Sequence, residues 1–441
     1  MADPINMTAL MAEVAVLRVE VDELNGVVQD MWHTVCFMIA FFNQMGFCLL
    51  EAGTVRAKHV RHILLTNLLD SIICVIAWYL VGWGMAFGPG NGFIGTEDYL
   101  ILDSQEYALW LIQLIFALTA VTIPSGVMVE RNRVIPYLLY VCLSSFLMYP
   151  ILAHWIWGPG GWLQQVGANG VLDSAGGLVV HSYAGVIALC ATAILGPRVG
   201  RFDPSSTAKP TPHNYPLVML GVWCLTIAWM AFNMGASTFR HGSQFRQVAQ
   251  IAISTLIGGF TSGLTYFVLQ EAWPQVLHFE GISSALLTGF AAMTSASALV
   301  EPWYGFPIGV CSALCFIGFA KLLEALKIDD PIDAVPVHLG GGICGVFWIG
   351  FVADPGHIAF FLGRPVESIT QYGCFLGGGG VQLGVQLLGL VMTCAWASAL
   401  TIAIYLPLRY FGYLRVSVEV EIAGLDNHDL GGSAYPDFKL N

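Results

Sequence analysis

Long apolar runs separated by short polar segments dominate the chain after residue 30. Each run has about 20 residues, the length that an α-helix needs to cross a hydrocarbon core of about 30 Å. The runs lie at 31–54, 63–87, 108–129, 135–157, 174–196, 216–236, 247–269, 282–299, 303–325, 334–353 and 376–408. The pattern therefore predicts an all-α membrane protein with eleven transmembrane helices. Because that number is odd, the two termini are expected on opposite sides of the membrane.

Residues 1–30 follow a different pattern and form a separate element, ahead of an eleven-helix domain at 31–408 and a tail at 409–441. Apolar residues recur here in alternating steps of four and three, the spacing of a coiled-coil seam. They are Leu10, Val14, Leu17, Val21, Leu24 and Val28. Two interpretations fit this amphipathic helix. It packs on its own bundle, or it associates outside the cell as a parallel coiled coil, which would suit a cyclic oligomer.

Basic residues indicate the orientation. With the N-terminus outside, 13 of the 17 Lys and Arg residues fall in inner loops and the C-terminal tail. Only Arg18, Arg240, Arg246 and Arg364 remain outside. Cytoplasmic loops of membrane proteins carry an excess of Lys and Arg, so we expect the N-terminus outside and the C-terminus inside. The first 30 residues are acidic and lack the basic region and short apolar core of a cleavable signal peptide.

Composition supports the membrane assignment and excludes several function classes. Of the 441 residues, 56% are hydrophobic and 10% charged, against about 25% charged in soluble domains. A net charge of −12 argues against a nucleic-acid partner. The 11 cysteines include no CxxC pair, so neither a disulfide framework nor a zinc site is indicated. We expect no cofactor, no metal and no enzyme activity, since no phosphate loop or nucleophile elbow appears.

Two histidines lie deep inside apolar runs. His181 is in DSAGGLVVHSYAGVIALCATAIL and His338 is in DAVPVHLGGGICGVFWIGFVA. An ionisable ring at bilayer depth is costly and usually faces a pathway or a polar partner. Asp173 and Asp333 open the two runs, where a carboxylate can cap exposed N–H groups. The alternative is that the two histidines lie in unrelated places, each satisfied by its own hydrogen bonds.

The first ten helices divide into two sets of five, and each histidine lies on the fifth helix of its set. Because five is odd, the second set enters the membrane from the opposite face, as in inverted-repeat transporters. The two histidine-bearing helices therefore start from opposite sides. We expect the rings to meet near the midplane, as part of a pore.

The chain resembles a known family, the ammonium transporter branch of the ammonium transporter/methylammonium permease/Rhesus superfamily. The matching segments, in the family's order, are FFNQMGFCLLEAGTVRAKHV, PSGVMVERNR, YPILAHWIWGPGGWL, DSAGGLVVHSYAG, WMAFNMGAS, DDPIDAVPVHLGGGICG and LRVSVEVEIAGLD. The resemblance implies eleven helices, a homotrimer with one pore per subunit, and a plasma-membrane location. It also implies ammonium and methylammonium as substrates.

The resemblance implies a recruitment site for NH4+ at the outer vestibule, formed by Trp157 and Phe116. A cation over an aromatic face gains about 0.5–2 kcal/mol, although a Trp at a helix end is also common as an interfacial anchor. Ala236 stands where the family often has a Ser that accepts a hydrogen bond from the ion, and Ser237 follows it. Ile112 stands where a first gate Phe is common, so the outer constriction is expected to be looser.

Inside the pore, the resemblance implies a hydrophobic gate of Phe116 and Phe232, which would exclude hydrated ions. Taken alone, Phe232 would be read as packing. His181 and His338 match the family's twin histidines, expected to pass a proton between rings while ammonia crosses the apolar conduit. Asp173 matches a buried Asp thought to orient the entrance, and capping of its helix explains it equally well.

The C-terminal tail departs from the pattern of many relatives at one position. In GLDNHDLGG, His428 replaces a Thr that many relatives carry and that can be phosphorylated. The tail at 409–441 is expected to dock on the cytoplasmic face, where a regulator can act on it.

One alternative is a sensor that binds ammonium and signals through a separate partner. Another is a Rhesus-type channel for neutral gas, against which Trp157 and the tail motif argue.

Overall fold

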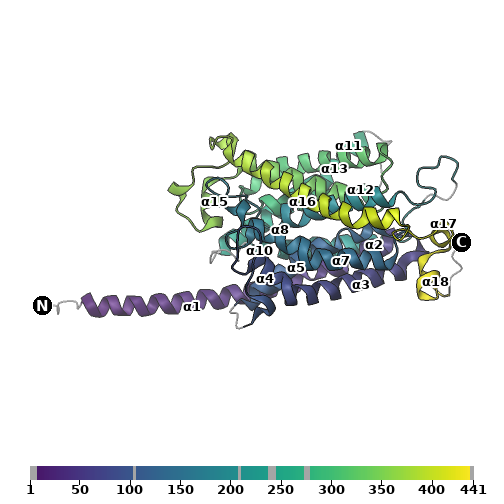
Figure 1. Ribbon diagram of the computed structural model, residues 1–441. Helices are drawn as coiled ribbons and strands as arrows, with labels where there is room; N and C mark the ends of the chain where they lie inside the picture. The colour runs from purple at the N-terminus through teal and green to yellow at the C-terminus, as the bar shows by residue number, and fades with distance from the viewer. Residues whose placement is uncertain (1–6, 103–105, 207–209, 237–244, 273–278, 438–441) are drawn as a thin grey trace.

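The computed structural model describes residues 7–102, 106–206, 210–236, 245–272 and 279–437. Long helices lie roughly along one direction in a single bundle, and α1 projects far beyond one end of it (Figure 1). The short tail helices α17 and α18 lie at the other end. We call these the α1 end and the tail end. Within the described residues, the only extended pairing is two isolated bridges, Gly90 with Gly95 and Asn132 with Arg415.

The α-helices are α1 (Met7–Ala40), α2 (Phe42–Thr54), α3 (Val60–Ala77), α4 (Trp83–Phe87), α5 (Tyr107–Thr122), α6 (Ser125–Met128), α7 (Val134–Leu143), α8 (Tyr149–Trp157), α9 (Tyr183–Leu195), α10 (Tyr215–Ala236), α11 (Phe245–Ala272), α12 (Phe279–Ala296), α13 (Gly305–Ala325), α14 (Gly341–Val352), α15 (Pro355–Leu362), α16 (Val381–Tyr410), α17 (Val418–Ala423) and α18 (Leu425–Leu430). Short 3-10 helices are η1 (Ala57–His59), η3 (Tyr99–Ile101), η5 (Trp162–Gln165), η8 (Pro302–Tyr304), η10 (Val366–Ser368) and η11 (Cys374–Leu376). Four segments are π-helical: η2 (Trp78–Gly82), η4 (Ser144–Met148), η6 (Gly177–Ser182) and η9 (Val335–Gly340).

Each of the eleven apolar runs falls on helix, and ten helical stretches of the described chain are long and apolar enough to cross a membrane. The run at 282–299 corresponds to α12, which is not among these ten. Helix α12 carries Glu280 and five Ser and Thr residues, and most of its residues are buried in the bundle. Ser and Thr side chains that face other helices can form hydrogen bonds inside a membrane bundle, so the lower hydropathy of α12 is compatible with its place in the bundle.

The π-helical segments are a feature that the hydrophobic pattern did not predict. Segments η2 and η4 join α3 to α4 and α7 to α8, whereas η6 and η9 begin the helices that continue as α9 and α14, and they contain His181 and His338. A single wide turn frees backbone groups and reorients the side chains that follow it, and such turns are frequent at functional sites. The two histidines therefore lie on locally reshaped helix starts.

Helix α1 runs without a break from Met7 into the bundle, where its later part packs on α5 and α10. The six apolar seam residues of its first part are all between 39% and 63% exposed. A Cβ at Gly26 would meet no atom within 4 Å. This stretch therefore does not pack on its own bundle, which removes the first of the two interpretations offered for it.

Candidate functional site

The two buried histidines are in direct contact. Nδ1 of His181 lies 3.1 Å from Nδ1 of His338, and the ring planes are 15° from parallel. His181 is 1% exposed and His338 is 5% exposed. At 3.1 Å, one Nδ1 must donate and the other accept, so the neutral pair holds one proton between the two rings. The expected meeting of the rings is present, and the alternative of two unrelated histidines is wrong.

Glycines let the two histidine helices approach this closely. A Cβ at Gly185, one turn after His181, would lie 2.4 Å from the backbone nitrogen of Leu339. A Cβ at Gly342, one turn after His338, would lie 2.4 Å from Oγ of Ser182. The contacts are reciprocal, since each glycine faces the neighbour of the other histidine. Any larger residue at either position would push the helices apart.

Aromatic rings form a continuous file that leads to this pair. Trp157 contacts Phe116 (ring centroids 5.7 Å apart), Phe116 contacts Phe232 edge-on (4.4 Å), and Phe232 contacts His181 (6.1 Å). On the other side, Phe47 lies 6.4 Å from His338. Phe116 and Phe232 are almost completely buried. The structure thus brings five of the candidate residues together in one row: Trp157, Phe116, Phe232, His181 and His338.

Trp229 is a neighbour of the pair that the sequence analysis missed. Its ring stacks on His181 at 4.9 Å and lies 6.2 Å from His338, nearly parallel to both. Its indole N–H donates to Oγ1 of Thr294, which fixes the ring in place. Trp229 precedes Phe232 by one helical turn of α10, so helical spacing within WMAFNMG could have indicated that both face the same side.

Asp173 holds the start of the first histidine helix. One carboxylate oxygen accepts from the N–H groups of Gly176 (3.1 Å) and Gly177 (2.8 Å). The other accepts from Leu178 (2.9 Å) and Val179 (3.1 Å). The carbonyl of Asp173 also accepts from the indole N–H of Trp157 at 2.9 Å. One residue therefore connects the aromatic file to the helix that carries His181.

At the second histidine helix, the arrangement differs from the expected one. The carboxylate of Asp333 accepts from Oγ of Ser284 at 2.9 Å, and its φ of 58° is left-handed. The N–H of Val335, in the first turn, donates instead to Asp330 at 2.7 Å. The turn at 330–333 places the earlier carboxylate under the helix start, because the left-handed residue redirects the chain.

A cavity of about 500 Å³ lies beside Trp157, next to the end of α15 at the α1 end of the bundle (Figure 1). Glu106, Gln164 and Asn169 contribute polar groups to its lining. Ala236 is buried at the last residue of α10. Ser237, the alternative hydroxyl, lies outside the described residues. The lining also includes the guanidinium of Arg364, so the hollow at which the aromatic file begins holds acceptors together with a positive charge.

A second buried polar cluster was also missed. Glu51 in α2 accepts from Oγ of Ser125 (2.6 Å) and from the amide of Asn67 (3.0 Å). Asp70, one turn after Asn67, accepts from the hydroxyl of Tyr137 at 2.7 Å. Both carboxyl groups are fully buried, and no basic side chain of the described chain forms an ion pair with either. The cluster joins α2, α3, α6 and α7 by hydrogen bonds alone.

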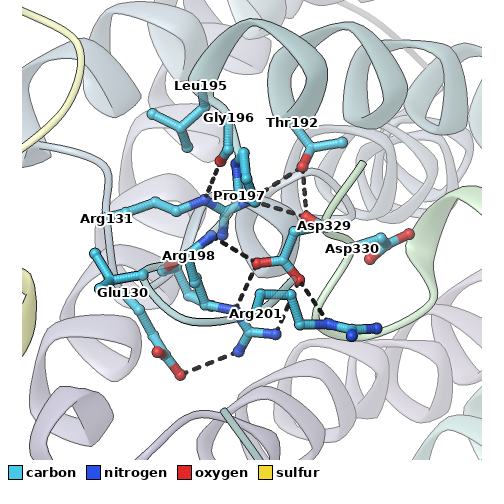
Figure 2. A network of polar contacts seen from close by, with 12 residues as sticks. Glu130, Arg131, Thr192, Leu195, Gly196, Pro197, Arg198, Arg201, Asp329 and Asp330 are labelled. Atoms are coloured by element: carbon cyan, nitrogen blue, oxygen red, sulfur yellow. Dashed lines mark hydrogen bonds and ion pairs between the residues drawn. The ribbon is translucent and has the colours of Figure 1, made fainter. Parts of the chain in front are cut away.

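The tail end is held by a network of buried charges (Figure 2). Arg198 donates to Asp329 through Nε at 2.8 Å and to Glu130 through Nη1 at 3.3 Å. Arg131 donates to Oγ1 of Thr192 and to the carbonyl of Asp329. Burial by itself would raise the pKa of Asp329, but the hydrogen bonds and charges of Arg198 and Arg131 outweigh it and lower the pKa to about 2. These loops are therefore tied together by charged groups.

The C-terminal tail joins the same network. Glu421 in α17 accepts from the backbone N–H of Val199 (2.7 Å) and pairs with Arg415 (2.8 Å). Asp426 in α18, also buried, accepts from the N–H groups of Arg61 and His62 at the start of α3. Carboxylates at a helix start satisfy N–H groups that have no partner within the helix. The tail is thus docked on the start of α3 and on the loop that follows α9.

These features define a helical, multi-pass membrane protein with a buried pair of histidines at the end of an aromatic file. The chain belongs to the ammonium transporter family, whose model, described as Ammonium Transporter Family, matches residues 31–435. The resemblance noted in the sequence is thereby confirmed, and the family, one of transporters, also confirms that the chain is not an enzyme.

Individual relatives agree. The chain is 37% identical over 404 residues to Ammonium transporter 3 of Dictyostelium discoideum, covering 90% of this chain and 91% of that protein. Among solved structures it resembles one titled Sensor Amt Protein with a TM-score of 0.83 and 28% identity, covering 92% of this chain and 99% of that one. It resembles Saccharomyces cerevisiae Mep2 with a TM-score of 0.77 and 27% identity, covering 89% of each chain.

Proposed function

We propose that this chain moves ammonium across the plasma membrane as a homotrimer, with one conduit in each subunit. NH4+ is recruited and deprotonated at the α1 end, ammonia crosses the apolar file, and the proton passes along His181 and His338. The observation that carries this proposal is the 3.1 Å contact between the two Nδ1 atoms where the aromatic file ends. Methylammonium is the expected analogue substrate.

Recruitment requires a site where the ion remains charged. The cavity beside Trp157 supplies an aromatic face together with polar groups, and a cation gains about 0.5–2 kcal/mol over such a face. Ala236 offers no hydroxyl, so the ring and the cavity carry recognition. Beyond this point Phe116 and Phe232 close the file, and a bare charge is far more costly to desolvate than a neutral amine. The ion therefore gives up its proton before the gate.

The histidine pair can carry that proton. With one proton between the two Nδ1 atoms, a proton that arrives on Nε2 of one ring pushes the shared proton to the other ring, which releases one from its own Nε2. Nε2 of His181 is buried and has no hydrogen-bond partner among the described residues, so it is available to ammonia. Each cycle moves one NH3 and one H+, and NH4+ re-forms at the tail end. K+ carries no proton and is rejected.

The topology proposed is eleven spans in a five-plus-five inverted repeat, with the N-terminus outside and the C-terminus inside. Support comes from the distribution of basic residues and from the position of α1 and the tail helices at opposite ends of the bundle (Figure 1). The reciprocal contacts of Gly185 and Gly342 are those that a twofold inverted arrangement would produce. Residues 31–408 are then the transport domain, and 409–441 a cytoplasmic tail.

The test is electrical recording with ammonium and methylammonium, alongside uptake of labelled methylammonium. Wild-type protein is expected to give a current that K+ does not evoke. His181→Asp and His338→Glu, which replace the paired rings, are expected to alter both current and selectivity. Uptake without current would indicate a neutral gas channel instead. Wild-type properties in both variants would remove the proton-sharing role of the pair.

A second candidate function is ammonium sensing. One specific observation favours it, the likeness of nearly the whole length of a structure titled Sensor Amt Protein. A sensor would bind ammonium with little flux, so currents and uptake close to those of empty membranes would favour sensing over transport. The current recordings therefore separate the two functions.

We also propose that the docked tail regulates flux and presents a surface to a cytoplasmic regulator. Truncation after Arg409 removes the contacts of Glu421 and Asp426 and is expected to lower transport, because the loops at the tail end lose their ties. Uptake by the truncated chain is the measurement. Undiminished transport would count against a gating role.

A further inference from the structure

The first part of α1 leaves an apolar stripe uncovered. Residues 7–30 extend beyond the bundle as one straight helix (Figure 1), and the six seam residues are all exposed. Amphipathic helices gain most of their stability by packing the apolar face against other elements. A continuous stripe of this kind calls for a partner helix.

The seam has a regular register. Val14, Val21 and Val28 take the a positions of three heptads, and Leu10, Leu17 and Leu24 take the d positions. In parallel coiled coils, β-branched residues at a with Leu at d favour an association of two strands. The register therefore specifies parallel helix association along the whole projecting part of α1.

We propose that this stripe is covered by the same stretch of neighbouring copies of this chain, in a parallel coiled coil outside the membrane domain. Every copy inserts into the membrane in the same direction, and α1 continues directly into the first span. The projecting helices of one oligomer therefore leave the membrane on the same side and point the same way. The proposal rests on the proposed function only in that it takes this chain to be an oligomer, and the Val and Leu register favours pairs of helices within that oligomer.

Charges at the edges of the seam fit this arrangement. Glu13 takes a g position and Arg18 the e position five residues later, the two positions that face each other between parallel chains. Arg18 is the only Lys or Arg in residues 1–55. In an antiparallel pair, g positions face g positions, so Glu13 and Glu20 would lie near like charges. The charge pattern thus favours the parallel register.

Other partners fit less well. A helix that lies on a lipid surface needs a basic polar face, whereas this stretch carries several acidic residues and one arginine. It also continues straight into a spanning helix instead of lying along the membrane plane (Figure 1). A second copy of the chain is the partner that matches both the stripe and the charges.

Cysteine cross-linking of the full-length chain in membranes tests the proposal. Leu17→Cys places a thiol at a d position, and Val19→Cys places one at the f position on the opposite face. The two native side chains are 52% and 58% exposed, so they are matched in accessibility. With a mild oxidant, Leu17→Cys is expected to run largely as a disulfide-linked pair of chains, and Val19→Cys as single chains. Wild-type protein measures the background of the native cysteines.

Equal cross-linking at both positions, or none at Leu17→Cys and at the next d position, Leu24→Cys, would overturn the proposal. As a second measurement, Arg18→Glu is expected to lower the temperature at which the oligomer dissociates in detergent by several degrees. Combining it with Glu13→Arg is expected to restore that temperature, and failure to restore it would count against the parallel register. Methylammonium uptake is recorded in parallel. Absence of uptake by wild-type protein, together with cross-links in Leu17→Cys, would refute transport and leave the coiled coil standing.

Discussion

At the scale of single residues, the site depends on the absence of side chains as much as on their presence. His181 and His338 can share a proton only because Gly185 and Gly342 allow their helices to touch. A hydrogen bond weakens steeply as the distance grows, so a displacement of 1 Å would end the exchange between the two Nδ1 atoms. Packing and proton transfer are therefore coupled at these two positions.

Gly342→Ala is accordingly expected to reduce transport at least about tenfold. Its Cβ would lie 2.4 Å from Oγ of Ser182 and 2.6 Å from the carbonyl of Gly177, and overpacking of this kind costs about 1–3 kcal/mol. The measurement is the ammonium-evoked current per copy of protein at the surface. The control is Gly318→Ala in α13, where a Cβ would meet no atom within 4 Å. Equal currents in the two variants would contradict the coupling.

The sequence predicted those residues whose chemistry is unusual for their surroundings. A histidine in an apolar run stands out, and so does an Asp before such a run. Trp229 and the Glu51–Asp70 cluster were missed for different reasons. Trp229 lies among other aromatic residues, and its role depends on which face of α10 meets the pair. Glu51 and Asp70 come from separate helices, and the hydrogen bonds that satisfy them appear only after packing.

At the scale of elements, the starts of the histidine helices are held by carboxylates that bind backbone N–H groups. Asp173→Asn keeps the shape of the side chain but removes the charge and one acceptor oxygen from four N–H donors. Replacing a cap residue by Ala costs about 0.5–2 kcal/mol, and Asn, which keeps one acceptor oxygen, is expected to lose only part of that. Because η6 carries His181, we expect the loss to disturb the ring geometry and reduce the current.

The matched control for this prediction is Asp354→Asn. Asp354 caps α15 by accepting from the N–H groups of Gly356 and His357, on a helix that carries none of the candidate residues. Asp354→Asn keeps one oxygen that can accept from both N–H groups, so it is expected to lower thermal stability less than Asp173→Asn, measured on purified protein in detergent. Only Asp173→Asn is expected to lower the current. Equal currents would make Asp173 a cap with no further role.

Hydrophobic runs predicted where the long helices lie, because burial in lipid or protein requires a stretch of about 20 apolar residues. They did not predict the π-helical turns η6 and η9, which depend on packing between helices instead of on composition. Nor did they identify Asp330 as the carboxylate that accepts from Val335. Asp330 takes the place expected of Asp333 because the backbone at Asp333 is left-handed, a conformation that residue identity does not specify.

At the scale of the whole molecule, the apolar body is closed at the tail end by charged groups. Asp329 receives hydrogen bonds from Arg198 and lies near Arg131 and Arg201, so one carboxylate links several loops (Figure 2). Buried ion pairs stabilise a fold only when their partners and hydrogen bonds are complete. Removing the charge of Asp329 would leave Arg198 with Glu130 as its remaining buried counter-charge, so protonation of Asp329 is expected to loosen the tail end.

The expected pH dependence follows from the pKa of Asp329, which is about 2 in the folded chain against an ordinary value of 3.8. Because the folded-state pKa is the lower one, the stabilisation is complete above about pH 4 and is lost as the pH falls from 4 to 2. The shift corresponds to about 2 kcal/mol. Thermal unfolding in detergent is therefore expected to show a difference in unfolding free energy between wild type and Asp329→Asn. This difference is constant near neutral pH and narrows by about 2 kcal/mol in acid. A gap that stayed unchanged down to pH 2 would mean that this carboxylate does not hold the tail end closed.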